Sequence, residues 1–237
     1  MAISDLQLPP AVHAHDFASP ALLAQALATR VADQLREAIG RQGVATLVVS
    51  GGRSPVAFFQ SLAREALDWS RVVISLADER WVPTEHPDSN AGLLKRYLLV
   101  GPVAKARFID LYRSTVSQED AAQQADRLLA ELPPIDVLVL GMGDDGHTAS
   151  LFPGSPNLAE ALRADGTQRC LPMMAPTVPR QRLSMTLSLL ASARLKVLSV
   201  SGQGKLTTLR TALAGEDIAQ MPIRAFLHTP LEIYWCP

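Results

Sequence analysis

Residues 44–55 read VATLVVSGGRSP, and this stretch indicates the class of the fold. Its first six residues are mostly apolar and rich in β-branched side chains, which is typical of a strand that is buried on both faces. Two glycines then predict a tight turn, and Ser54 followed by Pro55 is a common start for a helix. A buried strand that turns directly into a helix is the unit from which helix-covered parallel sheets are built.

The same alternation continues along the chain. Apolar residues recur every four positions from Leu23 to Ile39, which predicts an amphipathic helix that begins at Ser19-Pro20. Further helices are expected at about 55–67, 90–99, 117–132 and 204–213. Further strands are expected at 72–77, 108–111, 136–140, 183–187, 196–200 and 231–236. We therefore predict an α/β fold with a mostly parallel sheet and helices on both faces. It forms a single domain of residues 1–237, to which insertions could add a small lobe.

The composition excludes several classes of protein. The 237 residues carry 22 basic and 23 acidic side chains, and this balance lacks the basic excess of a nucleic-acid-binding protein. Apolar residues make up 48 % of the chain, which is too many for a disordered protein, and two cysteines cannot build a disulfide scaffold. No stretch approaches the roughly 18 apolar residues of a membrane span, and the N-terminal segment lacks the apolar run of a signal peptide. We expect a cytoplasmic protein without a nucleic-acid or membrane partner, and the sequence leaves its oligomeric state open.

Three of the predicted strands end in polar or glycine-rich segments. These segments are residues 50–55, 78–90 and 141–154. In open α/β sheets, ligands bind at the carboxyl ends of the strands, so the three segments are expected to meet on one rim of the sheet. The sequence therefore predicts a ligand site at that rim.

The first segment, SGGRSP, has the composition of a phosphate-binding turn. Gly51 and Gly52 would let backbone amides approach an anion closely, the N-terminus of the next helix adds partial positive charge, and Ser54 could donate its hydroxyl. The segment matches neither the phosphate loop G-x-x-x-x-G-K nor the motif G-x-G-x-x-G, so a dinucleotide is disfavoured. The alternative is a tight strand-to-helix turn that binds nothing.

The second segment begins with Asp78, Glu79 and Arg80, directly after a buried strand. Three consecutive charges are not expected in a protein core. They could form an ion pair at the edge of the sheet, which would contribute little to stability. Alternatively, Asp78 or Arg80 faces the ligand, and Arg80 would suit a phosphate, a carboxylate or a developing oxyanion. Residues 88–90 are most simply a helix cap.

The third segment, GMGDDGHTASLFPG, combines glycines with Asp144, Asp145 and His147. A histidine beside a carboxylate is the usual arrangement of a general base. These three residues match no recognised metal-ligand spacing, and no nucleophilic serine or cysteine motif is present, so neither a metal site nor covalent catalysis is expected. The alternative is a purely structural glycine loop. Arg182 and Lys205 could each reach a phosphate, although isolated cations of this kind are more often solvated surface charges.

The three motifs, in this order and spacing, resemble those of the 6-phosphogluconolactonase family. SGGRSP, DERWVP with DSN after it, and GMGDDGHTASLFPG carry the resemblance, which runs from about residue 47 to residue 209. It implies a Rossmann-like fold, shared with glucosamine-6-phosphate deaminases and related isomerases. It also implies that the substrate is a small phosphosugar lactone. The implied reaction is hydrolysis of 6-phospho-D-glucono-1,5-lactone in the oxidative pentose phosphate pathway, without a cofactor.

The resemblance also implies roles for individual residues. His147 would be the general base that activates water, and Asp145 would orient or polarise the His147 side chain. Arg80 would lie near the lactone or its developing oxyanion, and Asp78 aligns with the proton-transfer aspartate of the deaminases. The candidate positions for sugar phosphate are Gly51, Gly52, Arg53, Ser54, Arg182 and Lys205, of which Arg53 has no definite role.

Two other functions stay open. One is a sugar-phosphate isomerase or deaminase on the same fold. Deaminases of this superfamily place a glutamate immediately before the Pro-Gly that follows the DGH motif, whereas this chain has Phe152 there. An apolar side chain cannot relay a proton, so this difference favours the lactonase. The other is a non-catalytic sugar-phosphate sensor, which would keep the phosphate turn but would not need Asp145 and His147.

Overall fold

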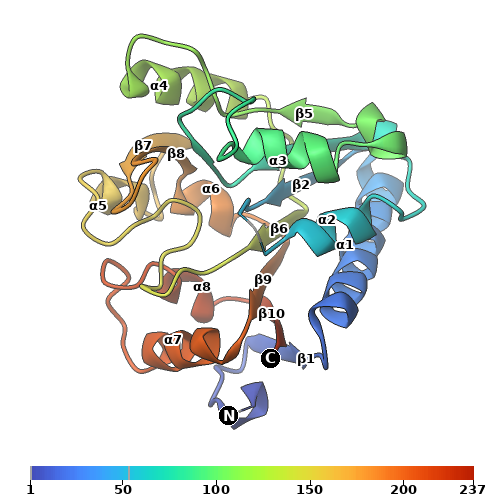
Figure 1. The fold of residues 1–237 in the computed structure, drawn as a ribbon, viewed down its shortest axis with the longest axis vertical. Helices are drawn as coiled ribbons and strands as arrows, with labels where there is room; N and C mark the ends of the chain where they lie inside the picture. The colour runs from blue at the N-terminus through green and yellow to red at the C-terminus, as the bar shows by residue number, and fades with distance from the viewer. Residues whose placement is uncertain (1, 53) are drawn as a thin grey trace.

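Seven strands form one parallel sheet in the computed structural model, which describes residues 2–52 and 54–237. The strands run in the order β1-β10-β9-β6-β2-β3-β5, and each neighbouring pair is parallel (Figure 1). Their bounds are β1 (Val12–Asp16), β2 (Ala45–Val49), β3 (Val72–Leu76), β5 (Arg107–Ile109), β6 (Val137–Leu140), β9 (Leu195–Ser201) and β10 (Leu231–Cys236). The predicted parallel sheet is therefore confirmed.

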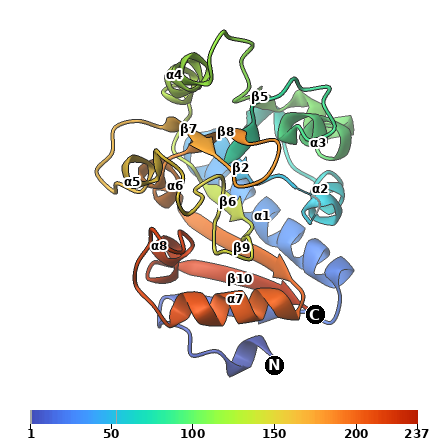
Figure 2. The same cartoon turned by 60° about the vertical axis from the view of Figure 1, so that its left-hand side comes forward.

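Helices cover both faces of this sheet, as predicted. The helix α1 (Pro20–Gln42) packs against β2, β6 and β10, and α7 (Gln203–Leu213) lies on the opposite side (Figure 2). The other α-helices are α2 (Val56–Leu62), α3 (Asn90–Tyr97), α4 (Gln118–Leu129), α5 (Leu158–Ala161), α6 (Leu187–Ala191) and α8 (Arg224–Leu227). Short 3-10 helices occur at Ile3–Asp5, Trp69–Arg71 and Gly101–Lys105.

The ends of α1 follow from its local sequence. The Ser19 hydroxyl accepts a hydrogen bond from the N–H of Leu22, and Pro20 occupies the first turn, where a missing N–H does no harm. Gly43 adopts φ +80° and donates its N–H to the carbonyl oxygen of Ile39, which closes the helix. The buried positions of the predicted apolar face are Leu23, Leu27, Val31 and Leu35.

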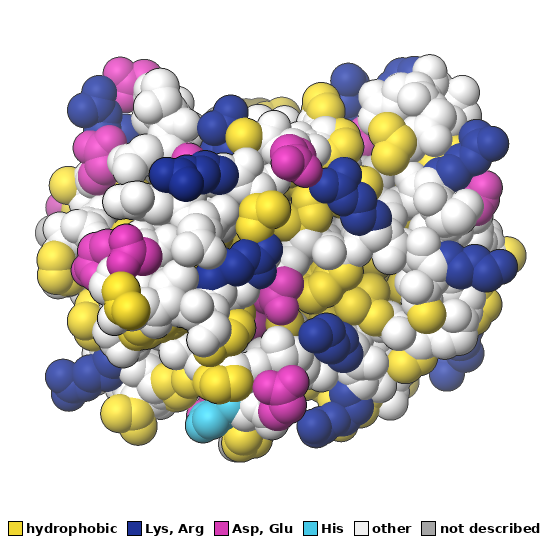
Figure 3. All heavy atoms as spheres, turned by 90° about the horizontal axis from the view of Figure 1, so that it is seen from above, with side chains coloured by type: hydrophobic (Ala, Val, Ile, Leu, Met, Phe, Trp, Pro, Cys, Tyr) yellow, Lys and Arg dark blue, Asp and Glu magenta, His cyan; other side chains and the backbone are white. Residues whose placement is uncertain are grey.

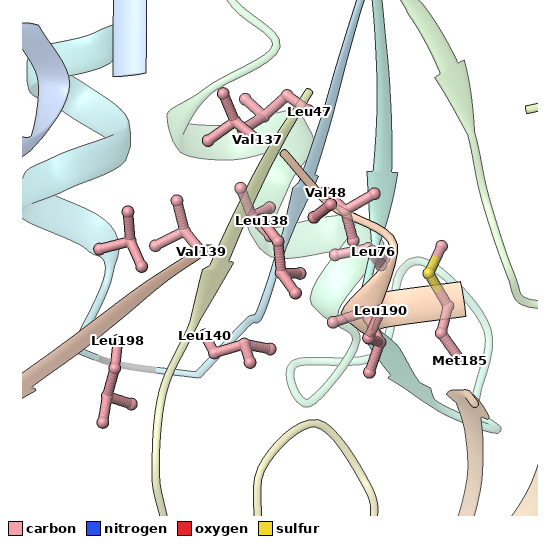
Figure 4. Packing of buried hydrophobic residues seen from close by; sticks show 14 of the residues in the cluster. Leu47, Val48, Leu76, Val137, Leu138, Val139, Leu140, Met185, Leu190 and Leu198 are labelled. Carbon is pink, nitrogen blue, oxygen red and sulfur yellow. The ribbon is translucent and has the colours of Figure 1, made fainter. Parts of the chain in front are cut away.

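The central strands form the core of the protein. All residues of β2, β3 and β6 are buried, which agrees with their continuous apolar sequence. Figure 4 shows Leu47 and Val48 of β2 beside Val137 and Leu138 of β6, and Leu140 of β6 beside Leu198 of β9. Each fully buried Leu or Val side chain contributes roughly 1.5–3 kcal/mol through removal of apolar surface from water. This rigid centre fixes the strand ends from which the loops of the rim emerge.

A second, antiparallel sheet departs from the prediction. It contains β4 (Asp78–Arg80), β8 (Gln181–Met185) and β7 (Cys170–Met174), in the order β4-β8-β7. The strand expected at residues 183–187 is therefore β8, it begins two residues earlier, and it does not join the parallel sheet. A short apolar run fits either kind of sheet, so the sequence pattern could not identify its partners.

One face of the molecule carries charged side chains of both signs. On the face that Figure 3 shows, Lys and Arg side chains are interspersed with Asp and Glu. Within the described residues, no helix combines the length and the apolar character that a membrane crossing requires.

Candidate active site

A cavity of about 350 Å³ lies where the three predicted segments meet. The turn after β2 and the loop after β6 line it, together with Asp78 and Arg80 of β4. The end of β9 contributes residues 199–201, β8 contributes Arg182, and α7 contributes Lys205. The three polar strand ends therefore surround one cavity, as the topology of a parallel sheet requires.

His147 and Asp145 form a hydrogen-bonded pair at this cavity. The Nδ1 of His147 and the Oδ1 of Asp145 lie 2.6 Å apart, and the same oxygen accepts the backbone N–H of His147 at 3.1 Å. Gly146, at φ +77°, makes the turn between the two residues. When the carboxylate accepts a hydrogen bond from Nδ1–H, the neutral imidazole has its lone pair on Nε2, where it can accept a proton. The hydrogen bond from His147 holds the pKa of Asp145 below its usual value, so this carboxyl group is ionised at neutral pH.

The His147 ring lies against Gly143 and Phe152. A Cβ at position 143 would lie 2.1 Å from the Cε1 and Nδ1 atoms of His147, so only glycine leaves room for the ring. The centroid of the Phe152 ring is 4.2 Å from that of the imidazole. In the sequence, Gly143 is only one of several glycines that allow a tight, irregular backbone in this segment. The packing shows that this glycine determines where the imidazole can sit.

Arg80 reaches the cavity from β4. Its Nη1 donates to the backbone oxygen of Asp88 at 2.7 Å and to the Oδ1 of Asn90 at 3.0 Å. Its Nε is buried and has no hydrogen-bond partner within the described residues. Buried donors are normally paired, and a guanidinium has five of them. Arg80 is therefore suited to donate to an anionic group in the cavity.

The expectation that the charges of residues 78–80 avoid the core is wrong for Asp78 and Glu79. Their exposed fractions are 7 % and 0 %, because the pairing of β4 with β8 brings both inside. The Oδ2 of Asp78 accepts a hydrogen bond from the hydroxyl of Ser150 at 2.6 Å, a contact that sequence reasoning missed. Burial raises the pKa of Glu79 to about 7, although the backbone N–H groups that donate to its carboxylate oppose this rise. Each buried carboxylate is satisfied by donors from other segments of the chain.

Arg182 is part of the cavity wall. It is buried, with an exposed fraction of 7 %, so its interpretation as a solvated surface charge is wrong. The Nε donates to the carbonyl oxygen of Pro179 at 2.9 Å, and the guanidinium lies 5.8 Å from the centroid of the Phe152 ring. Burial and the charge of Arg80 lower the pKa of Arg182. The charges of Asp78, Glu79 and Asp88 oppose this decrease in part, and an anion bound in the cavity would oppose it further.

Lys205 and the glycine turn border the same cavity. The Nζ of Lys205 donates to the Oδ1 of Asp144 at 2.6 Å, and the Asp144 side chain is 87 % exposed. The predicted positions of the turn that line the cavity are Gly51, Gly52 and Ser54. Arg53, also predicted for this turn, lies outside the described residues. The candidate phosphate positions that the structure describes therefore share one cavity with His147 and Arg80.

A family model described as glucosamine-6-phosphate isomerases/6-phosphogluconolactonase matches residues 18–235. The chain belongs to this family. The 6-phosphogluconolactonase of Pseudomonas putida is 63 % identical over 237 residues, which cover 100 % of this chain and 98 % of that protein. The 6-phosphogluconolactonase of Pseudomonas aeruginosa is 60 % identical over 238 residues, with full coverage of both chains. A crystal structure of a 6-phosphogluconolactonase from Shewanella baltica OS155 has a TM-score of 0.93 at 38 % identity, and the match covers 97 % of this chain and 100 % of that one.

Membership in the glucosamine-6-phosphate isomerase/6-phosphogluconolactonase family confirms the resemblance carried by the three motifs. In this member of the family, Asp78, Arg80 and His147 all line the cavity, whereas Asp145 contacts the Nδ1 of His147 and does not itself line it. The residues that sequence reasoning missed around these groups are Gly143, Ser150 and Glu79. Each of these three residues lies inside one of the motifs, so the motifs could have drawn attention to it. Its contacts with the site, however, depend on how the chain folds.

Proposed function

We propose that this chain is a 6-phosphogluconolactonase, which hydrolyses 6-phospho-D-glucono-1,5-lactone to 6-phospho-D-gluconate in the oxidative pentose phosphate pathway. The observation that carries the proposal is the His147–Asp145 pair on a cavity that also holds Arg80, Arg182 and Lys205. Full-length relatives with this activity in their names, at 63 % and 60 % identity, support it. A cytoplasmic location and a reaction without cofactor or nucleic acid belong to the same proposal.

The proposed reaction begins with general-base catalysis by His147. Its Nε2 takes a proton from a water molecule while the water oxygen bonds to C1 of the lactone. The ionised Asp145 stabilises the imidazolium that forms, and the Arg80 guanidinium donates to the carbonyl oxygen as that oxygen gains negative charge. The bond between C1 and the ring oxygen then breaks, and the ring oxygen takes the proton from His147 and becomes a hydroxyl group. The product is a carboxylic acid, which ionises at neutral pH.

The phosphate group of the substrate would be bound away from the reacting carbon. Arg182 is a buried cation in the cavity wall whose charge a bound anion would stabilise, and Lys205 lines the same cavity. The backbone of Gly51 and Gly52 can approach the phosphate closely because neither residue has a side chain. Binding energy from this group would hold the lactone ring against His147 in a reactive orientation.

The Phe152 ring favours hydrolysis over isomerisation or deamination. A ring-opening isomerase needs a proton relay around the sugar, and an apolar ring stands 4.2 Å from the imidazole centroid where a carboxylate would extend such a relay. A sensor without catalysis would have no use for the pairing of His147 with an ionised Asp145. An isomerase, a deaminase or a non-catalytic sensor would show no hydrolysis of the lactone above the spontaneous rate.

The test is the initial rate of hydrolysis of freshly generated 6-phosphogluconolactone, coupled to the oxidation of 6-phosphogluconate. The spontaneous rate in buffer is subtracted, and a His147→Ala variant serves as control. We expect a large excess rate that the variant loses. A rate no faster than buffer would refute the proposed function, and aldose–ketose isomerisation of sugar phosphates would then be measured with the same preparation.

Lys205 and Asp144 provide a prediction about substrate affinity. Replacing Lys205 with alanine is expected to raise KM about tenfold, because a charge-assisted contact to phosphate contributes roughly 1.5–3 kcal/mol. Asp144→Asn is expected to lower KM by up to about fivefold, because it frees Lys205 from an exposed ion pair that contributes roughly 0.2–1 kcal/mol. Steady-state kinetics at low and high salt check both effects, and the effect of Asp144→Asn should vanish at high salt. A wild-type KM in Lys205→Ala would show that Lys205 does not bind the phosphate.

A further inference from the structure

Glu79 is a buried carboxylate that joins β4 to the start of α3. Its Oε1 accepts the backbone N–H groups of Arg80 and Asn90, both at 2.7 Å. Its Oε2 accepts the N–H of Ala91 at 2.7 Å and the hydroxyl of Ser89 at 3.2 Å. Both oxygens are therefore used as acceptors for donors on either side of the loop between β4 and α3. This one side chain fixes the distance and orientation of the two elements.

Asn90 extends this connection to the cavity. Its side chain is buried; the Oδ1 accepts from the Nη1 of Arg80 at 3.0 Å, and the Nδ2 donates to the backbone oxygen of Asp78 at 2.9 Å. A Cβ at Gly51 would lie 2.0 Å from the Oδ1 of Asn90, so the amide group packs directly against the glycine turn. The Asn90 side chain thus contacts the turn after β2, the backbone of β4 and the guanidinium of Arg80.

We infer that Glu79 and Asn90 are positioning residues that hold the Arg80 guanidinium in its orientation toward the reacting carbonyl group. The carboxylate of Glu79 accepts the first backbone N–H groups of α3 and so fixes the position of its first turn. That turn carries Asn90, whose side-chain amide oxygen accepts a hydrogen bond from the Nη1 of Arg80. Neither Glu79 nor Asn90 is among the described residues that line the cavity. Their effect on the reaction therefore passes through Arg80, and the inference rests on the proposed function because it assigns Arg80 to the lactone.

The acceptor pattern determines the variant that tests Glu79. Glutamine has nearly the same shape, but its NH₂ group would face N–H donors that now meet a carboxylate oxygen. The charged groups that act on Glu79 include the guanidinium of Arg182 and the carboxylate of Asp110, which disfavours a second negative charge. Glu79→Gln removes that unfavourable charge and also breaks the acceptor set. A loss of activity in this variant would therefore arise from geometry and not from added charge repulsion.

The experiment measures kcat and KM for lactone hydrolysis in wild type, Glu79→Gln, Asn90→Ala and a control, Leu94→Ala. Leu94 is fully buried on α3 and takes part in none of the hydrogen bonds described above, so this control is expected to destabilise the same helix while Arg80 keeps its hydrogen bonds. We expect kcat/KM to fall about 10–100-fold in Glu79→Gln and Asn90→Ala, mainly through kcat, because small displacements of a reacting group have effects of this size. Leu94→Ala should keep the wild-type kcat below its own melting temperature.

A double-mutant cycle separates positioning from a structural role. In an Arg80→Ala background, Asn90→Ala should reduce activity no further, because the group that it positions is gone. An equal reduction in both backgrounds, or variants that behave like Leu94→Ala, would overturn the inference while the proposed function stands. A wild-type protein without lactonase activity would overturn both. Circular dichroism and melting curves identify any variant that fails to fold. If Asn90→Ala fails to fold, Asn90→Leu replaces it in the cycle, because leucine has nearly the same size as asparagine and lacks the acceptor for Arg80.

Discussion

Replacing His147 with alanine is expected to reduce kcat about 10²–10⁴-fold, the usual contribution of a general base. The imidazole accepts a proton only as water attacks the lactone, so its loss removes help to the transition state and little from substrate binding. KM should therefore change much less than kcat. The variant should fold normally because the ring lies at the cavity and is not part of the main core.

The measurement for His147→Ala is the coupled initial-rate assay with the spontaneous rate subtracted, together with a binding titration of 6-phosphogluconate. Asp145→Asn is the companion variant, because it keeps the shape of the side chain and removes the charge that stabilises the imidazolium. We expect its kcat to lie between those of the wild type and His147→Ala. An unchanged kcat in His147→Ala would exclude this residue from the mechanism.

Replacing Arg182 with alanine is expected to have the largest effect on substrate affinity. Arg182 is buried in the cavity wall, and its Nε donates to the carbonyl oxygen of Pro179. Its other donors are suited to a phosphate, and charge-assisted hydrogen bonds of this kind contribute roughly 1.5–3 kcal/mol, which corresponds to about a 10–150-fold increase in KM. The reduction in kcat should be much smaller, since the phosphate is remote from the reacting carbon.

Melting curves with and without phosphorylated ligand check the role of Arg182 independently of catalysis. In the unliganded protein, Arg182 is buried close to the like charge of Arg80, so its removal should not lower the melting temperature strongly. Added 6-phosphogluconate should raise the melting temperature of the wild type and have much less effect on Arg182→Ala. Arg182→Lys is the control that keeps the charge but not the planar donor group. Equal ligand-induced shifts in wild type and Arg182→Ala would exclude Arg182 as a phosphate ligand.

The α/β fold could be predicted because its signals are local. The apolar runs of β2, β3 and β6 are buried on both faces. A short, continuous apolar run rich in β-branched residues predicts such a strand without any knowledge of its neighbours. The ends of α1 are set by Ser19 and Gly43, which act on the backbone within one turn of the helix. The pair Asp145 and His147 is also local, since the two side chains are two residues apart with a glycine between them.

Other parts of the site could not be predicted because they depend on contacts between distant segments. The strand β4 pairs with β8, about a hundred residues later in the chain, and only this pairing buries Asp78 and Glu79. Three consecutive charges look like surface residues because a sequence pattern reports hydrophobicity and does not report which donors will surround a carboxylate.

Local sequence patterns were sufficient to predict the parallel sheet, the three polar strand ends and the family to which the chain belongs. The folded chain was needed to show that Arg182 is buried, that Lys205 pairs with Asp144, and that Asn90 packs on Gly51 and holds Arg80. The two sets of features differ in the range of the interactions that produce them. Helix caps and strand periodicity act within a few residues, whereas the burial of a charge requires partners that the fold brings from elsewhere in the chain.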